Sequence, residues 1–479
     1  MKKASNGLSA RQLTMMGLGS VIGGSFFLGS SVPIHAAGPA VIITFVLCGV
    51  MVHYILYALS EMTIKNPDSG SFRTFAAQAF GQGAGFLVGW VYWTGMVFAM
   101  SSEATAVSIL VRKWFPTLSI SFLGSIIIIC VTLINLLGAD KLSKFESALA
   151  TVKVVAIIFF ILIAMSLIVG LYPGKPAVGI GALANEPLMP GGIMGIAGSI
   201  LVVMFAYAGF EVIGLAASEA DTPQKTIPKA IRYTVVSLLG LYILSSAVML
   251  PLIPTNSLSE NKSAMVAALE ALGIGWAGAS INIILMTAIL STMFAALFGL
   301  GRMMRSLANE GFAPGFLIDK KDVPYHGILF SGLSILLGLW LALLAPRVYL
   351  FLISSGGFAV LFTYAAIMAT HIRLSIKDGR PAKGEFRMRG FPYSSLIVLV
   401  FLIVAIISMP FVSGQASGLV TGASMVAFYT LCYLIMKLYK RNYLKNRALK
   451  AYLFNSKLST EISDELTDNA KKEDDDLSS

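Results

Sequence analysis

Long apolar segments alternate with short polar ones along most of the chain. The apolar runs are about 20 residues long, which is the length of helix that crosses the hydrocarbon core of a bilayer. A helix on the surface of a soluble protein would instead carry polar positions every few residues. The pattern therefore predicts about twelve transmembrane helices, over residues 11–36, 39–60, 84–110, 119–138, 147–170, 192–217, 228–253, 273–300, 326–345, 349–370, 393–411 and 416–437.

The composition agrees with an integral membrane protein. Of the 479 residues, 56% are hydrophobic and 12% are charged, whereas a soluble globular chain carries about 25% charged residues. The chain begins Met1-Lys2-Lys3, as a signal sequence does. Its first apolar stretch is too long for a signal sequence and leads directly into a second span, so we interpret it as an uncleaved first helix.

The cysteines and histidines indicate no metal or disulfide framework. The three cysteines lie inside apolar runs, where a lone cysteine is a small packing residue. The four histidines have no spacing typical of metal ligands. These residues are Cys48, Cys130, Cys432, His35, His53, His326 and His371. We therefore expect no metal site and no cofactor.

The basic residues are placed asymmetrically among the loops. Cytoplasmic loops of membrane proteins carry an excess of Lys and Arg. If the N-terminus is cytoplasmic, most Lys and Arg residues fall in cytoplasmic loops and tails. The loops on the other side then hold only Arg112, Lys113, Lys175, Lys262 and Arg347. The asymmetry predicts a cell-membrane protein with both termini in the cytoplasm. It also accounts for the net charge of +11 without a nucleic-acid partner.

The spans divide the chain into three regions. We expect a cytoplasmic N-terminal tail over 1–10, a transmembrane domain over 11–437 and a C-terminal cytoplasmic tail over 438–479. The C-terminal tail is basic and then acid-rich, a composition typical of disorder. Within the transmembrane domain we expect two repeats, over about 11–170 and 192–370, and two further helices over about 393–437.

Glycines are concentrated in the first and sixth spans. The first span contains Gly17, Gly19, Gly23 and Gly24, and the sixth contains Gly195, Gly198, Gly209 and Gly214. Glycine inside a helix costs about 1 kcal/mol relative to alanine. Close helix packing explains the outlying glycines. If the two repeats correspond, however, both glycine clusters occupy the same place, and paired helix breaks of this kind indicate a transporter binding site.

Such breaks expose backbone groups that suit an amino acid. The N–H groups of Gly23, Gly24 and Ser25 would open a half-helix whose positive end attracts a carboxylate. The freed carbonyls of two breaks would suit an ammonium group. A zwitterionic α-amino acid presents both groups. The predicted substrate site consists of Val21, Ile22, Gly23, Gly24, Ser25, Phe205, Ala206, Ala208 and Gly209.

These residues resemble the amino acid–polyamine–organocation superfamily, in particular its bacterial amino acid permeases of the aromatic, lysine and GABA type. The resemblance covers nearly the whole chain except the two tails. Its motifs lie at 19–30, 67–72, 85–93, 219–229, 302–314 and 355–373. One departure is Ser25, where the family usually has the second glycine of an I-G-x-G motif. The resemblance implies a LeuT-like fold with five plus five inverted repeats, discontinuous helices 1 and 6, and alternating access.

Several other polar and aromatic residues lie in the spans. Glu103 matches the family's E-L-T-A stretch, and an intramembrane carboxylate is a functional candidate by default. The alternative is a structural partner at the extracellular rim. We expect Glu211 to hold unwound backbone of the sixth span. Glu61 and Glu219 end their spans on the cytoplasmic side, as gate or loop ion-pair residues. Candidates for the pocket or gate are Ser102, Phe205, Tyr207, Phe210, Met293 and Ser355, with plain packing as the alternative for the aromatic residues.

Lys153 is the candidate for proton coupling. It lies in the fifth span with no other charge between Glu146 and Lys175. By resemblance, related permeases place a lysine here, near spans 1 and 8, where sodium-coupled relatives of the fold hold an ion. The alternative is that the side chain snorkels to the cytoplasmic face.

The sequence thus predicts a secondary transporter for amino acid uptake, by proton-coupled symport of a neutral amino acid. The neutral substrate follows from the small or apolar pocket candidates. Alternatives are an amino acid or polyamine exchanger, a channel, and a membrane nutrient sensor that does not transport. The chain is not expected to be an enzyme, because it has no H-E-x-x-H, P-loop or nucleophile–base signature. Its expected partners are an amino acid, protons and the lipid bilayer. Nothing in the sequence indicates an oligomeric state.

Overall fold

The computed structural model describes residues 8–65, 71–137, 139–215, 220, 222–259, 262–319, 323–344, 348–382, 385–412 and 415–439. The chain divides into two compact units, residues 1–426 and 427–479. Every contact described below lies within the first unit. Glu219 and nearly all of the predicted C-terminal tail lie outside the described residues.

The described part of the chain is helical. Its β pairing consists of one isolated bridge between Leu8 and Ala220. Among the residues that the structure describes, nine helical segments are long and apolar enough to cross a membrane, and two shorter apolar helices accompany them. The long helices are α4 (Val41–Lys65), α6 (Gln82–Val111), α8 (Ala139–Val169), α11 (Pro223–Met249), α13 (Gly275–Asn309), α14 (Tyr325–Ala342), α15 (Val348–Lys377), α16 (Tyr393–Ser408) and a last helix, Ala416–Tyr439. The shorter ones are α7 (Ile120–Asn135) and α9 (Gly192–Ala206).

The first and sixth predicted spans are interrupted, as the glycine clusters predict. The first span consists of α1 (Ala10–Val21), α2 (Gly24–Phe27) and α3 (Ser31–Ala37). The sixth consists of α9 and α10 (Glu211–Leu215). Each of the twelve predicted spans therefore corresponds to one helix or to one interrupted helix. The inverted-repeat relation between the two halves stays a prediction.

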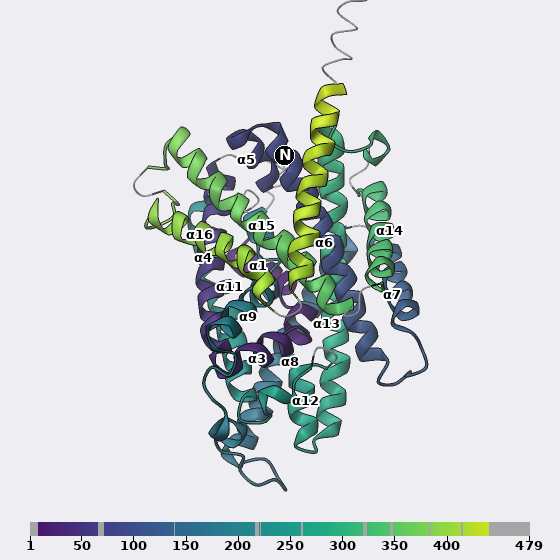
Figure 1. Cartoon of the computed structure of the whole chain (residues 1–479), viewed down its shortest axis with the longest axis vertical. Helices are drawn as coiled ribbons and strands as arrows, with labels where there is room; N and C mark the ends of the chain where they lie inside the picture. Colours follow the sequence, from purple (N-terminus) through teal and green to yellow (C-terminus); the bar gives the residue numbers. More distant parts are fainter. Residues whose placement is uncertain are drawn as a thin grey trace, which may run out of the picture. The chain divides into compact units, whose positions relative to one another are not determined.

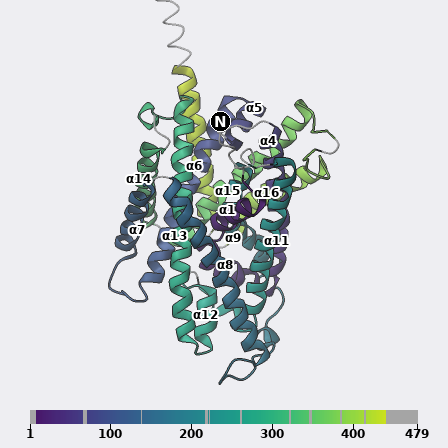
Figure 2. The same cartoon turned by 180° about the vertical axis from the view of Figure 1, so that it is seen from behind.

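Two helices were not predicted, α5 (Ser71–Phe80) and α12 (Ala264–Ala271). Both are much shorter than a membrane span, so the search for runs of about 20 apolar residues does not detect them. Figures 1 and 2 show α5 near one end of the first unit and α12 near the opposite end. These ends are called the α5 end and the α12 end below. Single 3₁₀ turns occupy Gly38–Ala40, Gly181–Asn185, Thr255–Ser257, Gly315–Leu317 and Met409–Phe411.

Local sequence fixes where α1 begins. The Ser9 hydroxyl accepts a hydrogen bond from the backbone N–H of Gln12, and the Gln12 side chain accepts one from the backbone N–H of Ser9. This reciprocal pair is a capping box, which satisfies two N–H groups that the first helical turn leaves free. From this start α1 packs against α8, α10, α11 and α13. Its C-terminal end, and with it the first break, is therefore in the interior.

Candidate functional site

The first break separates α1 from α2. Ile22 and Gly23 have extended backbone conformations, so the helix stops after Val21 and starts again at Gly24. All residues from 17 to 31 are buried. A Cβ atom added to Gly24 would lie 2.4 Å from a carboxylate oxygen of Glu103. Glycine at position 24 is thus what lets α6 approach the break.

The carboxylate of Glu103 occupies the N–H groups of this break. The backbone N–H of Gly24 donates to Oε2 at 2.7 Å, and that of Ser25 donates to Oε1 at 3.2 Å. Glu103 is 3% exposed. Hydrogen bonds to an ionised acceptor are roughly twice as strong as neutral ones. Two of the three N–H groups predicted to bind a substrate carboxylate therefore already bind a carboxylate of the protein.

Lys153 lies on the other side of the same break. Its ammonium group donates to the carbonyl of Gly19 at 2.6 Å and to the hydroxyl of Thr292 at 2.9 Å. That hydroxyl lies 3.1 Å from the carbonyl of Ile22. The Lys153 side chain is fully buried. The alternative of snorkelling to the membrane surface is therefore wrong in this structure, because the ammonium group points to α1 and α13.

The second break lies between α9 and α10. Gly209 has a positive φ of 108°, and a Cβ atom there would lie 2.6 Å from the carbonyl oxygen of Ser20. Only glycine fits this conformation and this close contact with α1. The carboxylate of Glu211 accepts the N–H of Gly209 at 3.0 Å and the hydroxyls of Tyr92 and Tyr364 at 3.0 and 3.1 Å. Glu211 thus holds unwound backbone and connects it to α6 and α15.

Aromatic side chains surround the two breaks. The Tyr242 hydroxyl donates to the carbonyl of Ala206 at 3.0 Å, and its ring stacks on Phe26 with 3.8 Å between centroids. The Tyr207 hydroxyl donates to the carbonyl of Phe45 at 3.2 Å. The carbonyl of Phe205 accepts the N–H of Ala208 at 3.0 Å. Two carbonyls of the second break are therefore already hydrogen-bonded within the protein.

The remaining pocket candidates are buried. Ser102, Met293, Ser355 and Phe210 are each at most 2% exposed. The Ser102 hydroxyl donates to the carbonyl of Ala99 in its own helix, whereas the hydroxyl of Ser355 has no hydrogen-bond partner among the described residues. The part of the chain that the structure describes holds no cluster of His, Cys, Asp and Glu suited to a metal ion.

Comparison with known proteins identifies the family. The family model described as "Amino acid permease" matches residues 12–452. A gamma-aminobutyric acid permease of Bacillus subtilis is 30% identical over 436 residues, which cover 90% of this chain and 93% of the relative. A gamma-aminobutyric acid permease of Escherichia coli is 32% identical over 433 residues, 89% of this chain and 92% of the relative. An L-asparagine permease of Salmonella typhimurium is 32% identical over 416 residues, 84% of this chain and 82% of the relative.

The chain belongs to the amino acid permease family. This confirms the resemblance, the all-helical membrane fold and the expectation of a transporter rather than an enzyme. The permease is a multi-pass membrane protein. Its family and its relatives indicate that its substrate is an amino acid.

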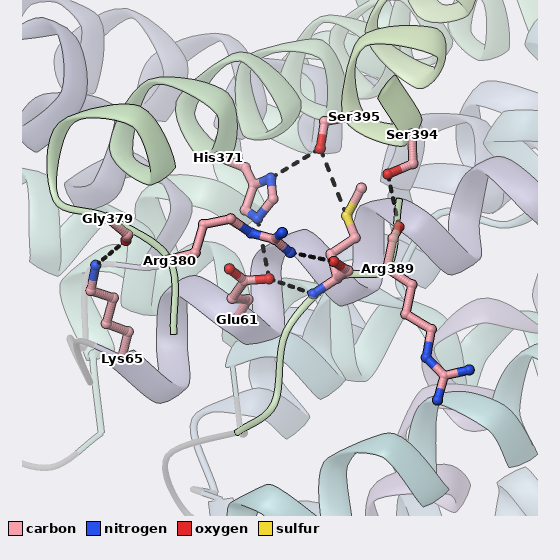
Figure 3. Close-up of polar contacts among 9 residues, drawn as sticks. Glu61, Lys65, His371, Gly379, Arg380, Arg389, Ser394 and Ser395 are labelled. Carbon is pink, nitrogen blue, oxygen red and sulfur yellow. Dashed lines mark hydrogen bonds and ion pairs between the residues drawn. The ribbon is translucent and has the colours of Figure 1, made fainter. Parts of the chain in front are cut away.

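A second polar cluster of the permease lies at the α5 end (Figure 3). Glu61, near the end of α4, is 4% exposed and accepts the backbone N–H of Met388 at 2.6 Å. His371 of α15 is fully buried, and its Nε2 atom lies 3.4 Å from the Glu61 carboxylate. Arg380 donates to the carbonyl of Met388 at 2.5 Å. Glu61 therefore anchors the connection between α15 and α16 to the end of α4.

Ion pairs join helices at both ends of the permease. At the α5 end, the buried Arg73 donates to both carboxylate oxygens of Glu310, at 2.7 and 2.5 Å. The hydrogen bond from Arg73, partly opposed by burial, lowers the pKa of the Glu310 carboxyl. At the α12 end, Glu270 pairs with both Lys113 and Lys262. None of these pairings was predicted, because their partners are far apart in sequence.

Proposed function

We propose that the chain is a secondary active transporter that takes up a neutral L-amino acid together with a proton by alternating access. The observation that carries the proposal is the buried ammonium of Lys153 at the first break, bonded to Gly19 and Thr292. A charge buried this deeply in a membrane protein is costly and is a functional candidate by default.

Lys153 connects three helices through its charge. Its hydrogen bonds tie α8 to the end of α1 and to α13. Loss of its proton removes the charge that strengthens these bonds. Protonation therefore favours the arrangement in which the three helices are held together, and deprotonation favours one in which α1 is released. A proton that binds on one side of the membrane and leaves on the other then biases the two access states.

The substrate carboxylate binds the N–H groups of Gly23, Gly24 and Ser25 in this proposal. Glu103 accepts the last two of these bonds here, so the substrate carboxylate has to replace it. The displaced Glu103 then lies beside the substrate. Its carboxylate and the carbonyls of Val21 and Ala208 accept hydrogen bonds from the substrate ammonium group.

A neutral substrate agrees with the pocket and with the relatives. Ser102, Met293 and Ser355 offer no charged group to a substrate side chain. Gamma-aminobutyric acid and asparagine, named for the relatives, each carry one ammonium and one carboxylate group.

The proposed orientation places both termini and the α5 end in the cytoplasm. The support is the excess of Lys and Arg in the loops at that side. Lys65, Arg73 and Arg380 lie there, whereas Lys113 and Lys262 lie at the α12 end.

Uptake into liposomes that contain only this protein tests the proposal. A panel of labelled amino acids is offered with an inward proton gradient and no sodium. We expect a neutral amino acid to accumulate above its outside concentration. Uptake that requires an amino acid or polyamine inside the liposome indicates the exchanger, passive equilibration indicates a channel, and no uptake indicates the sensor. Each of these three results contradicts proton-coupled symport.

A further inference from the structure

A cavity of about 300 Å³ opens at the α5 end, away from the two helix breaks. It lies between the last turns of α4, the helix α5 and the end of α15 with the residues that follow it. Its polar lining residues are Glu61, Lys65, Gln78, His371, Ser375 and Asp378. The cavity with its lining residues is called the α5-end pocket below. A volume of about 300 Å³ is at the lower end of the range for small-molecule sites.

The floor of the pocket carries a buried negative charge. Glu61 is 4% exposed, and its Oε2 atom accepts the N–H of Met388. The Nε2 atom of His371 lies 3.4 Å from this carboxylate, and the guanidinium of Arg380 is also close enough to act on it electrostatically. A carboxylate offers about four lone-pair sites. The floor therefore keeps acceptor capacity on the Glu61 carboxylate, beside the buried ring of His371.

The rim of the pocket carries a positive charge on the same helix. Lys65 follows Glu61 by four residues, so both side chains lie on one face of α4, about 6 Å apart along its axis. Lys65 is exposed, and its ammonium group donates to the carbonyls of Asp378 and Gly379 at 3.3 and 2.8 Å. An ammonium group has three donors, so one donor remains for a ligand at the rim. Figure 3 shows Lys65 at Gly379 and Glu61 facing His371.

The walls between floor and rim are mixed. Phe75, Met62 and Leu374 are apolar, and Gln78 and Ser375 are polar. Apolar walls with a few placed polar groups are typical of small-molecule sites.

We propose that the α5-end pocket is a second binding site for a small zwitterionic amino acid, with the ammonium group at Glu61 and the carboxylate at Lys65. A zwitterion matches a pocket whose charges are separated in this order. A plain amine would leave Lys65 unused, and a plain carboxylate would be repelled by Glu61. The site does not depend on the proposed central site or on proton coupling. When occupied, it joins α4 to the end of α15, so amino acid on that side of the membrane acts on the permease without entering its centre.

Protection of an introduced cysteine tests the site in the full-length protein. Ser375→Cys places a thiol in the pocket lining, in a background where Cys48, Cys130 and Cys432 are replaced by serine. The rate of maleimide labelling is measured with gamma-aminobutyric acid and with L-asparagine as probes. At a probe concentration of ten times its Kd we expect labelling to slow about tenfold, following the occupancy of a single site. Absence of protection by both probes overturns the proposal.

Probes that carry a single charged group, and variants of the pocket and of the central region, show which site is responsible for the protection. Butylamine and butyrate each carry one of the two charged groups, and each should protect far less than gamma-aminobutyric acid. Equal protection by butylamine overturns the zwitterion assignment in favour of an amine site. Lys65→Met changes an exposed side chain and should abolish protection.

Variants that fill the central region, Gly24→Val or Met293→Trp, whichever remains monodisperse, should keep the protection. Protection that survives Lys65→Met but is lost in the central variant overturns the proposal, because the signal then comes from the centre. Absence of uptake by the protein without these substitutions, with protection intact, contradicts the proposed function and leaves the pocket assignment supported.

Discussion

The carboxylate of Glu103 accepts the backbone N–H of Gly24 at 2.7 Å, across 79 residues of sequence. This bond and its companion to Ser25 hold the unwound segment of the first span against α6. A helix break in a membrane needs partners for its free N–H groups. Glu103 supplies them for the N–H groups of Gly24 and Ser25.

Glu103→Gln should destabilise the protein. The amide can present one oxygen to the two N–H groups, and its NH₂ group then faces the other donor. Hydrogen bonds to charged groups contribute about 1.5–3 kcal/mol each, so a loss of that order is expected. Thermal unfolding in detergent measures it. Ser102→Ala is the matched control, because its hydroxyl bonds only within its own helix. Equal stability of Glu103→Gln and the wild type would contradict this role.

Gly209→Ala should also destabilise the protein, by about 1–3 kcal/mol, because a residue with a Cβ is strained at a positive φ. The added atom would in addition meet the carbonyl of Ser20 at 2.6 Å. Gly240→Ala is the matched control, since an added Cβ meets nothing within 4 Å there. The control should be neutral or slightly stabilising because alanine favours the helix. Similar melting temperatures for the two variants would show that the second break does not require glycine.

The pairing of Arg73 with Glu310 should make stability depend on pH. Because the pKa of Glu310 is lowered in the folded state, its contribution is present above the unfolded pKa and is lost as pH falls through the folded one. Glu310→Gln should therefore be less stable than the wild type at neutral pH, and the difference should shrink at pH values below about 4. Melting curves across this range measure it. A difference that does not change with pH would mean that the charge of Glu310 contributes nothing.

The proposed topology predicts opposite labelling at the two ends. A cysteine near Lys262 should react with an impermeant reagent from outside the cell, and one near Lys383 only after the membrane is opened. Lys383 itself lies outside the described residues. Reaction of both cysteines from the same side would disprove the orientation.

The helices and their breaks could be predicted from the sequence because their signals are local. Apolar runs mark the spans, and the glycines around Gly23 and Gly209 mark the two breaks. Glu103 and Lys153 stand out because charges are rare inside apolar runs. Their partners could not be predicted, since Lys153 reaches Gly19 across 134 residues and Thr292 across 139.

Three site residues were missed for a similar reason. Tyr242, Tyr92 and Tyr364 sit on ordinary apolar helices, and tyrosine is common in such positions. Their hydroxyls acquire a role only when packing brings them to Ala206 or to Glu211. The short helices α5 and α12 were not predicted, because the hydropathy signal requires an apolar run as long as a membrane span. Glu103 was expected either as a functional residue or as a structural partner at the extracellular rim. Its carboxylate lies at the first break.

Proton-driven accumulation by the Lys153→Gln variant tests the central claim most directly. The wild type and the variant are reconstituted, and uptake of the same amino acid is followed with an inward proton gradient and without sodium. Glutamine keeps a polar N–H donor at this position but cannot carry the charge. We predict that the variant still binds the amino acid and equilibrates it, but no longer concentrates it when the gradient is applied. A variant that still concentrates the amino acid under the proton gradient, or a wild type that does so only with sodium, would contradict the account.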